Sequence, residues 1–343
     1  MVKVWGTFLT TSSYLEGVLT LNYSLVQTNS KYNLIVFYTQ SLLDSDPWTI
    51  EELQKRNIQV KFIDELKISE EITLAEKRFS LNFSKLNAFK LIEFERIGIL
   101  DADMLIRANI DELLEMPLSK DSIAATHACV CNPKKKINYP IDWSPGNCAY
   151  NMQSFEDAQR TGYECNFGIG MLNGGLIIFE PSLNIHKRFV DALVMNGDIP
   201  LLFAEQELIS NLLKGMWKPL PYIYNGLKTL RHCHVNIWKD ENVKIVHYIL
   251  DKPWEMKTQK NDESDDEYSV VNSWWREMNE RRLNDEKRKM QIISKLILEI
   301  ILITENSRVE QEDIKNSSFD FRFRVKVRLE CEFYGFKLEN KNI

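Results

Sequence analysis

The chain has 343 residues and a mass of 40.3 kDa, which is enough for one large domain with an extension or for two ordinary domains. Hydrophobic residues make up 44% of it and charged residues 27%, which is the composition of a soluble globular protein. The net charge of −6 argues against a nucleic-acid-binding surface, because such a surface carries a clustered basic patch.

The N-terminal part alternates between strand-like and helix-like segments. Strands are predicted over residues 2–10, 33–38 and 58–63 and in the apolar run that ends at Asp101, and helices over residues 14–28, 47–56 and 84–95. Ser12 or Ser13 is available to cap the first of these helices. Strands and helices that alternate in this way predict a doubly wound α/β fold.

The middle of the chain continues this pattern around a long insertion. A short helix over residues 109–115, strands over 122–126 and 243–248, and helices from Ser182 and over 204–215 are predicted. Residues 171–180 indicate a turn followed by a buried strand. Residues 127–169 form an irregular insertion that contains several prolines. Because loops of that length in a compact domain are often functional, we expect the insertion to contribute to a binding surface.

The character of the sequence changes beyond Lys257. An acidic run over residues 261–267 precedes a highly charged helical stretch over 274–289. Residues 319–333 then alternate apolar and polar side chains, which predicts a strand whose hydrophobic face needs a partner sheet. We therefore expect one domain over residues 1–257 and a charged helical and strand-like extension over residues 258–343, for which the sequence indicates no role.

Neither a targeting segment nor a membrane span is evident. Residues 1–7 enter a strand-like segment without the organisation of a signal peptide. The longest candidate for a span, residues 292–304, is interrupted by Ser294, Lys295 and Glu299 and is shorter than the roughly 18 apolar residues that a span needs. A soluble, cytoplasmic protein is expected.

Six cysteines in a chain of this length do not indicate a disulfide scaffold. Four of them fall close together in the sequence, with His127 nearby: Cys129, Cys131, Cys148 and Cys165. Thiolates and imidazole are the usual ligands of structural zinc, so a metal site is one interpretation. Because the spacing His-x-Cys-x-Cys matches no strong zinc pattern, we favour the other interpretation, in which these are buried or partly buried thiols.

Two carboxylates stand where the fourth predicted strand ends. Asp101 and Asp103 follow the apolar run and flank Ala102. If the chain stays extended, both carboxylates point the same way and converge on one cation; if it bends, one binds directly and the other through water. Acids at the carboxyl end of a central strand lie where open α/β sheets bind ligands. The pair predicts a Mn²⁺ or Mg²⁺ site with open positions for substrate phosphates.

Several segments support a family assignment when they are taken together. They are the first strand and helix, Phe83-Ser84-Lys85-Leu86, Leu100-Asp101-Ala102-Asp103, Asn109-Ile110-Asp111-Glu112-Leu113, Asn173-Gly174-Gly175, and His247 followed by Lys252-Pro253-Trp254. Their order and spacing resemble the family 8 retaining glycosyltransferases, the group of glycogenin and galactinol synthase. The resemblance covers roughly residues 2–255. It implies a GT-A-type, Rossmann-like mixed sheet that binds a nucleotide-sugar.

The resemblance also implies a reaction, the metal-dependent transfer of glucose or galactose from a UDP-sugar to an acceptor hydroxyl with retention of configuration. Asp101, Asp103 and a neutral His247 would hold the cation, which neutralises charge as UDP departs. Glu205 and Gln206 would be the catalytic residues beside the sugar, with Gln206 close to the anomeric carbon. The remaining donor contacts are implied for the uridine, the diphosphate or the sugar: Phe8, Thr10, Thr11, Tyr14, Arg78, Lys85, Ala102, Asn173, Gly174 and Lys252.

The sequence departs from the family pattern in several places. The usual Asp-Gln is Glu205-Gln206, which lengthens the acid by one methylene group. The loop Tyr248–Asp251 is one residue shorter than in glycogenin and lacks the customary glycine. Residues 229–234 hold no counterpart of the tyrosine that glycogenin glucosylates on itself, which disfavours self-glucosylation. The insertion between Cys129 and Cys148 is more similar to galactinol synthase and its fungal relatives.

Two other functions stay open on the sequence alone. A catalytically silent scaffold that keeps the fold for binding partners is one, and the missing loop glycine and the C-terminal strand motivate it. A nucleotidyltransferase is the other, because it also uses a cation and a nucleotide. For a glycosyltransferase, the acceptor stays open among a polyol such as inositol, a glycan and a protein. A homodimer is also left open, and no nucleic-acid partner is expected.

Overall fold

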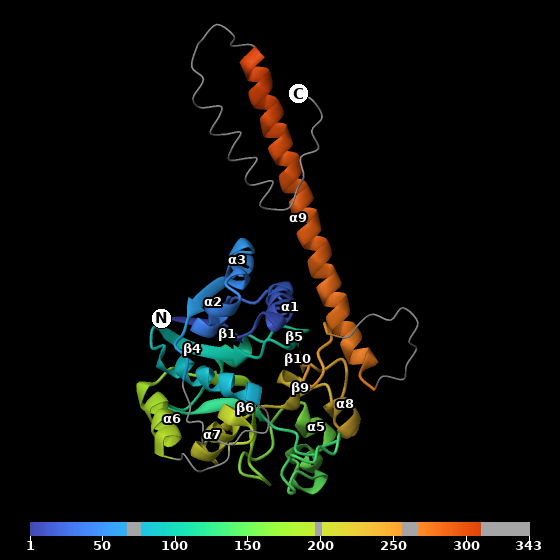
Figure 1. The fold of residues 1–343 in the computed structure, drawn as a ribbon. Coiled ribbons are helices and arrows are strands. Elements are labelled where there is room, and N and C mark those ends of the chain that lie inside the picture. Colours follow the sequence, from blue (N-terminus) through green and yellow to red (C-terminus); the bar gives the residue numbers. More distant parts are fainter. Residues whose placement is uncertain (67–76, 196–200, 256–266, 310–343) are drawn as a thin grey trace. The chain divides into compact units, whose positions relative to one another are not determined.

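The computed structural model describes residues 1–66, 77–195, 201–255 and 267–309, with side chains for all of these except 77–80, 195 and 302–309 (Figure 1). The chain divides into two compact units, Met1–Met278 and Asn279–Ile343, and each is described by itself. The predicted boundary at residue 257 falls in a segment outside the described residues, so the division into 1–257 and 258–343 stays a prediction.

The first unit is built on a mixed sheet of seven described strands in the order β3-β2-β1-β4-β7-β6-β8. The strands are β1 Val2–Leu9, β2 Leu34–Tyr38, β3 Gln59–Phe62, β4 Phe94–Leu100, β6 Ile123–His127, β7 Leu172–Phe179 and β8 Lys218–Pro219. β3, β2, β1 and β4 are parallel neighbours, whereas β7 is antiparallel to both β4 and β6. Because Gly6 of β1 pairs with Ile99 of β4, these two strands end at the same edge.

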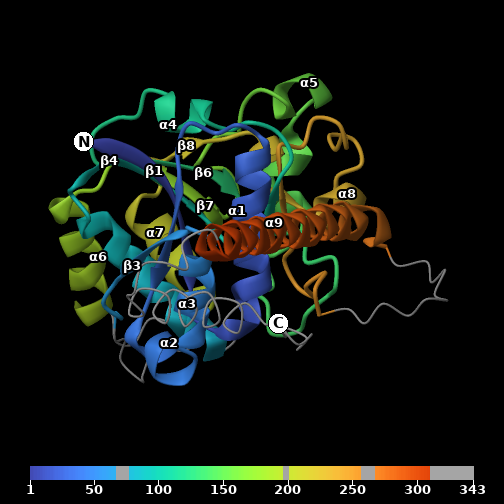
Figure 2. The same ribbon diagram turned by 90° about the horizontal axis from the view of Figure 1, so that it is seen from above.

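Helices cover both faces of this sheet. Figure 1 shows α1, α2 and α3 above the strands and α6 and α7 below them, and Figure 2 looks down on α1. The helices are η1 Ser12–Tyr14, α1 Leu15–Gln27, α2 Gln40–Ser45, α3 Trp48–Lys55, η2 Lys77–Lys90, α4 Glu112–Glu115, η3 Pro145–Asn147, η4 Ala149–Met152, α5 Phe155–Ala158, α6 Leu183–Met195, α7 Ala204–Leu212, η5 Tyr222–Tyr224 and α8 Leu230–Cys233. The predicted α/β class is therefore confirmed.

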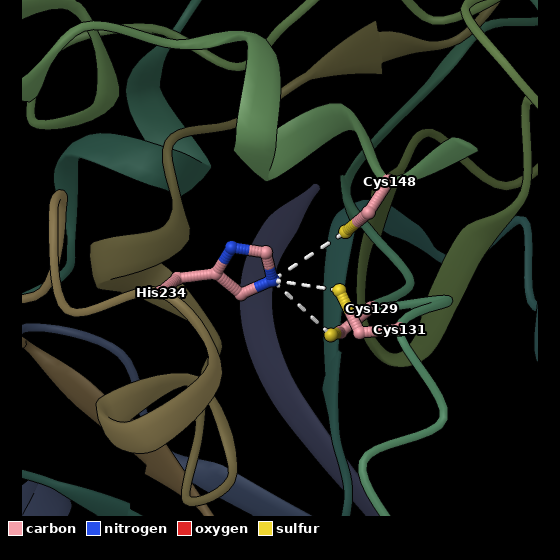
Figure 3. Close-up of side chains that lie close together, drawn as sticks. All are labelled: Cys129, Cys131, Cys148 and His234. Carbon is pink, nitrogen blue, oxygen red and sulfur yellow. Dashed lines mark hydrogen bonds between the residues drawn. The ribbon is translucent and has the colours of Figure 1, made fainter. Parts of the chain in front are cut away.

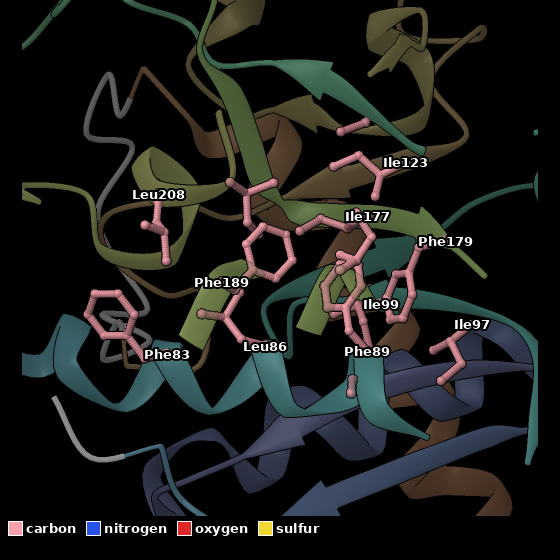
Figure 4. Packing of buried hydrophobic residues seen from close by; sticks show 14 of the residues in the cluster. Phe83, Leu86, Phe89, Ile97, Ile99, Ile123, Ile177, Phe179, Phe189 and Leu208 are labelled. Carbon is pink, nitrogen blue, oxygen red and sulfur yellow. The ribbon is translucent and has the colours of Figure 1, made fainter. Parts of the chain in front are cut away.

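Side-chain alternation along the central strands gives the sheet two hydrophobic cores. Ile97, Ile99 and Phe179 point to one face, where they pack with side chains of η2, α6 and α7 (Figure 4). Leu100 and Ile178 point to the other face and pack with α1 and α3. Successive residues of a strand point to opposite faces, so a strand covered on both sides is apolar at nearly every position. This explains the continuous apolar runs of β4 and β7.

A second sheet of three short strands has the order β5-β10-β9. Its strands are β5 Met104–Ile106, β9 Gly226–Leu227 and β10 Ile245–His247. β10 is antiparallel to β5 and parallel to β9. Because β5 follows β4 after three residues, this sheet begins at the edge where β1 and β4 end. A third hydrophobic cluster includes residues of this sheet and of the insertion, with Tyr150 and Tyr248 fully buried.

Three segments differ from their predicted structure. The helix expected over residues 84–95 is the 3-10 helix η2, which ends at Lys90, because Phe94 and the residues after it pair with β1 instead. The first α-helix begins at Leu15, and neither Ser12 nor Ser13 caps it, since both belong to the 3-10 turn η1. Residues 173–175 lie inside β7 and not in a turn before it.

The charged stretch predicted over residues 274–289 belongs to a longer helix, α9, which covers Ser269–Val309. The division between the two units falls within this helix. The strand predicted over residues 319–333 lies outside the described residues. Within the described part of the chain, every helix is too short or too polar to span a bilayer.

Candidate active site

Asp101 and Asp103 lie on the turn that joins the two sheets. The N–H of Met104 donates to the carbonyl of Asp101 at 3.2 Å, which closes the turn. The N–H of Asp101 donates to the carbonyl of Gly175 at 2.8 Å and ties the start of the turn to β7. Of the two predicted alternatives, the bend is therefore found, because the chain changes sheets here. The side chain of Asp101 is 26% exposed and that of Asp103 is 8% exposed.

Strand pairing brings His247 to these carboxylates. Antiparallel pairing sets His247 opposite Met104, and the N–H of Tyr248 donates to the carbonyl of Asp103 at 2.9 Å. The Nε2 of His247 lies 3.2 Å from Asp103 Oδ1 and 3.7 Å from Asp101 Oδ2. One ligand atom from each residue lies within 4.8 Å of the others, so the three side chains are close enough to bind one metal ion.

Hydrogen bonds through two asparagines determine the tautomer of a neutral His247. The N–H of Gly175 and the Nδ2 of Asn225 donate to Asn173 Oδ1, at 3.0 and 2.8 Å. The Oδ1 of Asn225 is then an acceptor, and it lies 2.9 Å from His247 Nδ1. Nδ1 therefore carries the proton, and the lone pair of Nε2 faces two carboxylates. Because that contact is repulsive without a cation, the donor set fits a metal ion, and Asn225 orients its imidazole ligand.

Gly175 makes room for the imidazole ring. A Cβ added at Gly175 would lie 2.4 Å from Cε1 and 2.7 Å from Nδ1 of His247. A glycine weakens a strand interior, and it often marks a place where another group approaches the backbone closely. The Asn173-Gly174-Gly175 segment therefore forms part of β7, and its glycines serve close packing where a turn was predicted.

Lys252 contacts the carboxylate pair from the loop that follows β10. Its ammonium group contacts Asp103 Oδ2 and donates to the carbonyl of Tyr248 at 2.9 Å. Burial alone would raise the pKa of Asp103, but the charge of the Lys252 ammonium group outweighs burial and holds that pKa well below its usual range. Asp103 is therefore ionised at neutral pH and available as a ligand.

The shortened loop before Lys252 contains a residue in the left-handed conformation. Leu250 has a φ of 65°. A residue with a Cβ adopts that conformation at a cost of roughly 1–2 kcal/mol, whereas glycine adopts it freely. The loop in which the customary family glycine is missing thus still uses a glycine-like conformation.

A second ion-pair network joins η2, the turn between β4 and β5, and α7. The Nζ of Lys85 donates to Asp101 Oδ1 at 2.6 Å and to Glu205 Oε1 at 3.0 Å. Burial raises the pKa of Glu205, and the attraction of Lys85 offsets part of that rise. Burial disfavours the charged form of Lys85, but Asp101 and Glu205 together raise its pKa above the ordinary value. The Oε2 of Glu205 is buried without a hydrogen-bond partner among the described residues.

The start of α7 adjoins the glycines of β7. The Oε1 of Gln206 accepts a hydrogen bond from the N–H of Gly174 at 2.9 Å. A Cβ at Gly174 would lie 3.1 Å from Glu205 Oε1, so this glycine also permits a close approach. Ala204, directly before Glu205, has a φ of 51°, which is a strained conformation for alanine. Gln206, Gly174 and Glu205 are thus brought together as expected.

The residues implied for the nucleoside follow the end of β1. Thr10 and Thr11 are half-buried, and Thr11 Oγ1 lies 2.9 Å from Ser13 Oγ. Tyr14 packs edge-on against Trp254 with ring centroids 5.7 Å apart, and the Nζ of Lys252 lies 5.6 Å from the Tyr14 ring. Tyr14 therefore connects the end of β1 with the lysine that contacts Asp103.

Two implied residues are not brought to this cluster by their side chains. The ring of Phe8 is buried in the core, with its centroid 5.1 Å from that of Phe37. The methyl group of Ala102 is buried in the core on the α1 side of the sheet. Arg78 lies in η2, and its side chain is outside the described residues.

Sequence reasoning missed Asn225. It is fully buried just before β9, and its amide holds the ring of His247. No local pattern marks it, since its partners Asn173 and His247 are contributed by β7 and β10.

Comparison with known proteins assigns the chain to a family. The family described as Glycosyl transferase family 8 matches residues 7–258. Galactinol synthase 3 of Arabidopsis thaliana is 29% identical over 290 residues, 82% of this chain and 83% of that protein. Galactinol synthase 2 of the same plant is 26% identical over 310 residues, 86% of this chain and 88% of that protein. Galactinol synthase 1 of Solanum lycopersicum is 27% identical over 81% of this chain and 82% of that protein.

Solved structures share the fold. The glycosyltransferase GlyE of Streptococcus pneumoniae TIGR4 has a TM-score of 0.51 at 15% identity, over 84% of this chain and 64% of that chain. The galactosyltransferase LgtC, in complex with donor and acceptor sugar analogs, has a TM-score of 0.53 at 12% identity, over 82% of this chain and 96% of that chain. These likenesses confirm the predicted GT-A fold. The match of the family to residues 7–258 means that the chain belongs to glycosyl transferase family 8.

Proposed function

We propose that this protein transfers a hexose, glucose or galactose, from a UDP-sugar to an acceptor hydroxyl, in a metal-dependent reaction that retains the anomeric configuration. The observation that carries the proposal is the convergence of Asp101, Asp103 and the Nε2 of His247 within 4.8 Å. Carboxylate oxygens suit Mn²⁺ and Mg²⁺, and imidazole is compatible with Mn²⁺. Membership of a glycosyltransferase family supports a nucleotide-sugar as the donor.

The two lysines beside the carboxylates have different roles in this proposal. Lys85 is held by a second carboxylate, Glu205, so it positions Asp101 and α7. Lys252 contacts Asp103 and lies near Tyr14, and we expect it to turn to a donor phosphate once a cation neutralises Asp103. The cation, when bound, stabilises the negative charge that develops on departing UDP.

Retention is implied by the family resemblance, and the side chains at the start of α7 bear on how it is achieved. Glu205 is 2% exposed, and its Oε1 is paired with Lys85, so it is poorly placed to attack a sugar. We therefore favour front-face attack by the acceptor hydroxyl. The bond between the anomeric carbon and the phosphate oxygen of UDP breaks, and that oxygen takes the proton of the hydroxyl. Gln206 is the side chain that we expect beside the anomeric carbon.

The curated relatives favour one donor and one class of acceptor. Galactinol is a galactoside of inositol, and the relatives named galactinol synthases match more than four fifths of this chain. Their names support UDP-galactose as the donor and a polyol as the acceptor, ahead of a glycan or a protein. UDP-glucose is the second donor to test.

A ligand-stabilisation experiment tests the donor site. UDP and Mn²⁺ together, each at about 100 times its dissociation constant, should stabilise the fold by at least about 2.7 kcal/mol. For a domain of this size that is a rise in Tm of roughly 5–10 °C. Mn²⁺ alone should give a smaller rise, and ADP with Mn²⁺ should not match UDP. An unchanged Tm in millimolar UDP and Mn²⁺ would contradict the proposed site.

Gly175→Ala should abolish that joint stabilisation. The added methyl group overlaps the ring of His247 and would turn Nε2 away from the two carboxylates. Overpacking of this kind typically costs about 1–3 kcal/mol of stability. The variant should therefore have a lower Tm than the wild type but should still fold. Gly146→Ala is the matched control, because a Cβ there meets only Ser144 Oγ, at 4.0 Å. If Gly175→Ala kept the full Tm rise with UDP and Mn²⁺, His247 would not be a ligand.

A further inference from the structure

Three cysteines and one histidine meet in a cluster that shares no residue with the carboxylate site. Figure 3 shows the sulfur atoms of Cys129, Cys131 and Cys148 on one side of the His234 ring, all facing Nε2. The three sulfurs lie 3.4, 3.4 and 3.5 Å from that nitrogen. One ligand atom of each residue lies within 4.8 Å of all the others.

Hydrogen bonds to His234 do not by themselves explain this arrangement. A ring nitrogen without a proton has one lone pair and accepts one hydrogen bond, whereas a protonated one has one proton to donate. Three sulfur atoms at nearly equal distances from His234 Nε2 therefore cannot all be satisfied by that nitrogen. A partner at the centre of the four atoms would satisfy all of them.

The distances match a tetrahedral zinc site. With Zn–S near 2.3 Å and Zn–N near 2.0–2.1 Å, a tetrahedron sets each sulfur about 3.6 Å from the nitrogen. The distances of 3.4–3.5 Å are within about 0.2 Å of that edge. We propose that Cys129, Cys131, Cys148 and His234 bind one structural zinc ion, with the three thiols losing their protons as the metal binds.

Burial and ligand number assign the site a structural role. Cys148 and His234 are fully buried, and Cys129 and Cys131 are partly buried. Four protein ligands complete the tetrahedron and leave no position for water or substrate, as in structural sites. The ring of Tyr150 packs against His234 with centroids 5.5 Å apart and contributes to its orientation.

The ion would connect the insertion to the segment that carries His247. The three cysteines belong to the insertion after β6, whereas His234 directly follows α8, between β9 and β10. The insertion also stacks Trp143 on Phe203, with ring centroids 4.3 Å apart, two residues before Glu205. A zinc ion bound by these four residues would therefore hold the insertion beside the N-terminal end of α7 and against the second sheet.

The structure also shows which predicted members of the cluster do not take part. The Nε2 of His127 lies 3.0 Å from the carbonyl of Tyr163, and Cys165 packs at the edge of the core below the large sheet. The fourth ligand is His234, which follows Cys148 by a long stretch of sequence and belongs to no spacing pattern. This explains why the spacing of the cysteines alone gave no strong zinc signal.

Metal analysis of the full chain tests the proposal. The wild-type chain, purified with a reducing agent and without added metal, should carry about one zinc ion per chain. Cys129→Ser and Cys148→Ser should lose nearly all of it and become more sensitive to proteolysis within residues 127–169. Cys165→Ser is the matched control, because it changes a partly buried cysteine outside the cluster and should keep the zinc.

Cobalt substitution gives a second measurement that does not depend on the folding of variants. Co²⁺ in the wild-type chain should give the ligand-field bands of a tetrahedral site together with thiolate-to-cobalt charge-transfer bands, and carboxylate ligands do not produce the charge-transfer bands. Two results would overturn the proposal. One is zinc that stays in Cys129→Ser and Cys148→Ser but is lost in Asp103→Asn. The other is a zinc-free wild-type chain that gives no tetrahedral cobalt spectrum.

Discussion

Asp103→Asn should lower the rate of hexose transfer by about 10³-fold or more. The substitution removes a charged ligand from the proposed cation site, and a loss of about 4 kcal/mol of transition-state stabilisation corresponds to three orders of magnitude. Asp103 is the more buried of the two carboxylates, and it contacts both His247 and Lys252. The measurement is UDP release from a UDP-hexose at saturating Mn²⁺.

Two controls separate catalysis from folding in that experiment. Asp44→Asn is the same chemical change at an exposed position of α2 and should leave the rate unchanged. Near-ultraviolet circular dichroism reports whether Asp103→Asn keeps its tertiary packing, since the change leaves Lys252 without its carboxylate partner. A folded Asp103→Asn variant with wild-type activity would disprove the metal assignment.

Lys85→Met should destabilise the fold by about 3–5 kcal/mol, because it leaves Glu205 buried without its partner. Burial already raises the pKa of Glu205, and loss of Lys85 raises that pKa further. A carboxyl group with a raised folded-state pKa contributes no penalty below its unfolded pKa of about 4.3, where it is protonated in both states. The penalty then grows as pH rises through the folded-state pKa.

Urea denaturation at pH 5 and pH 8 checks this expectation. The stability difference between the wild type and Lys85→Met should be larger at pH 8 than at pH 5. Adding Glu205→Gln to Lys85→Met should recover part of the loss at pH 8 and reduce its dependence on pH, because the buried charge is removed. A loss below about 1 kcal/mol, or the same loss at both pH values, would contradict the role given to this network.

Much of the fold could be predicted because it follows from local patterns. The apolar runs of β4 and β7 are continuous since both faces of the large sheet are covered, and this indicated buried strands. The boundaries were less predictable where pairing overrides propensity. Glu95 continues a helix-like stretch of sequence, but it lies in β4 because the residues next to it pair with β1.

The candidate site was only partly predictable, for a similar reason. Asp101 and Asp103 are neighbours in sequence, and the family resemblance added His247 and Lys252. The contacts of Asn225 and the pairing of Lys85 with Glu205 depend on strand and helix packing that no spacing encodes. Gly175 was misassigned to a turn, because glycine signals both a turn and a close approach, and only the structure shows the ring of His247 against it.

The products that the wild-type chain forms from a UDP-hexose show whether it transfers the hexose to a hydroxyl with retention. The wild-type chain would be incubated with Mn²⁺, myo-inositol and either UDP-galactose or UDP-glucose, and the products followed by proton NMR. We expect release of UDP together with a new α-linked hexoside, and both should be lost when EDTA removes the metal. Release of hexose 1-phosphate in place of UDP would identify a nucleotidyltransferase, and a β-linked product would exclude retention. If UDP were released from neither donor, with polyols or with cell extract as acceptor, the protein would not be a hexosyltransferase and would instead be a catalytically silent scaffold.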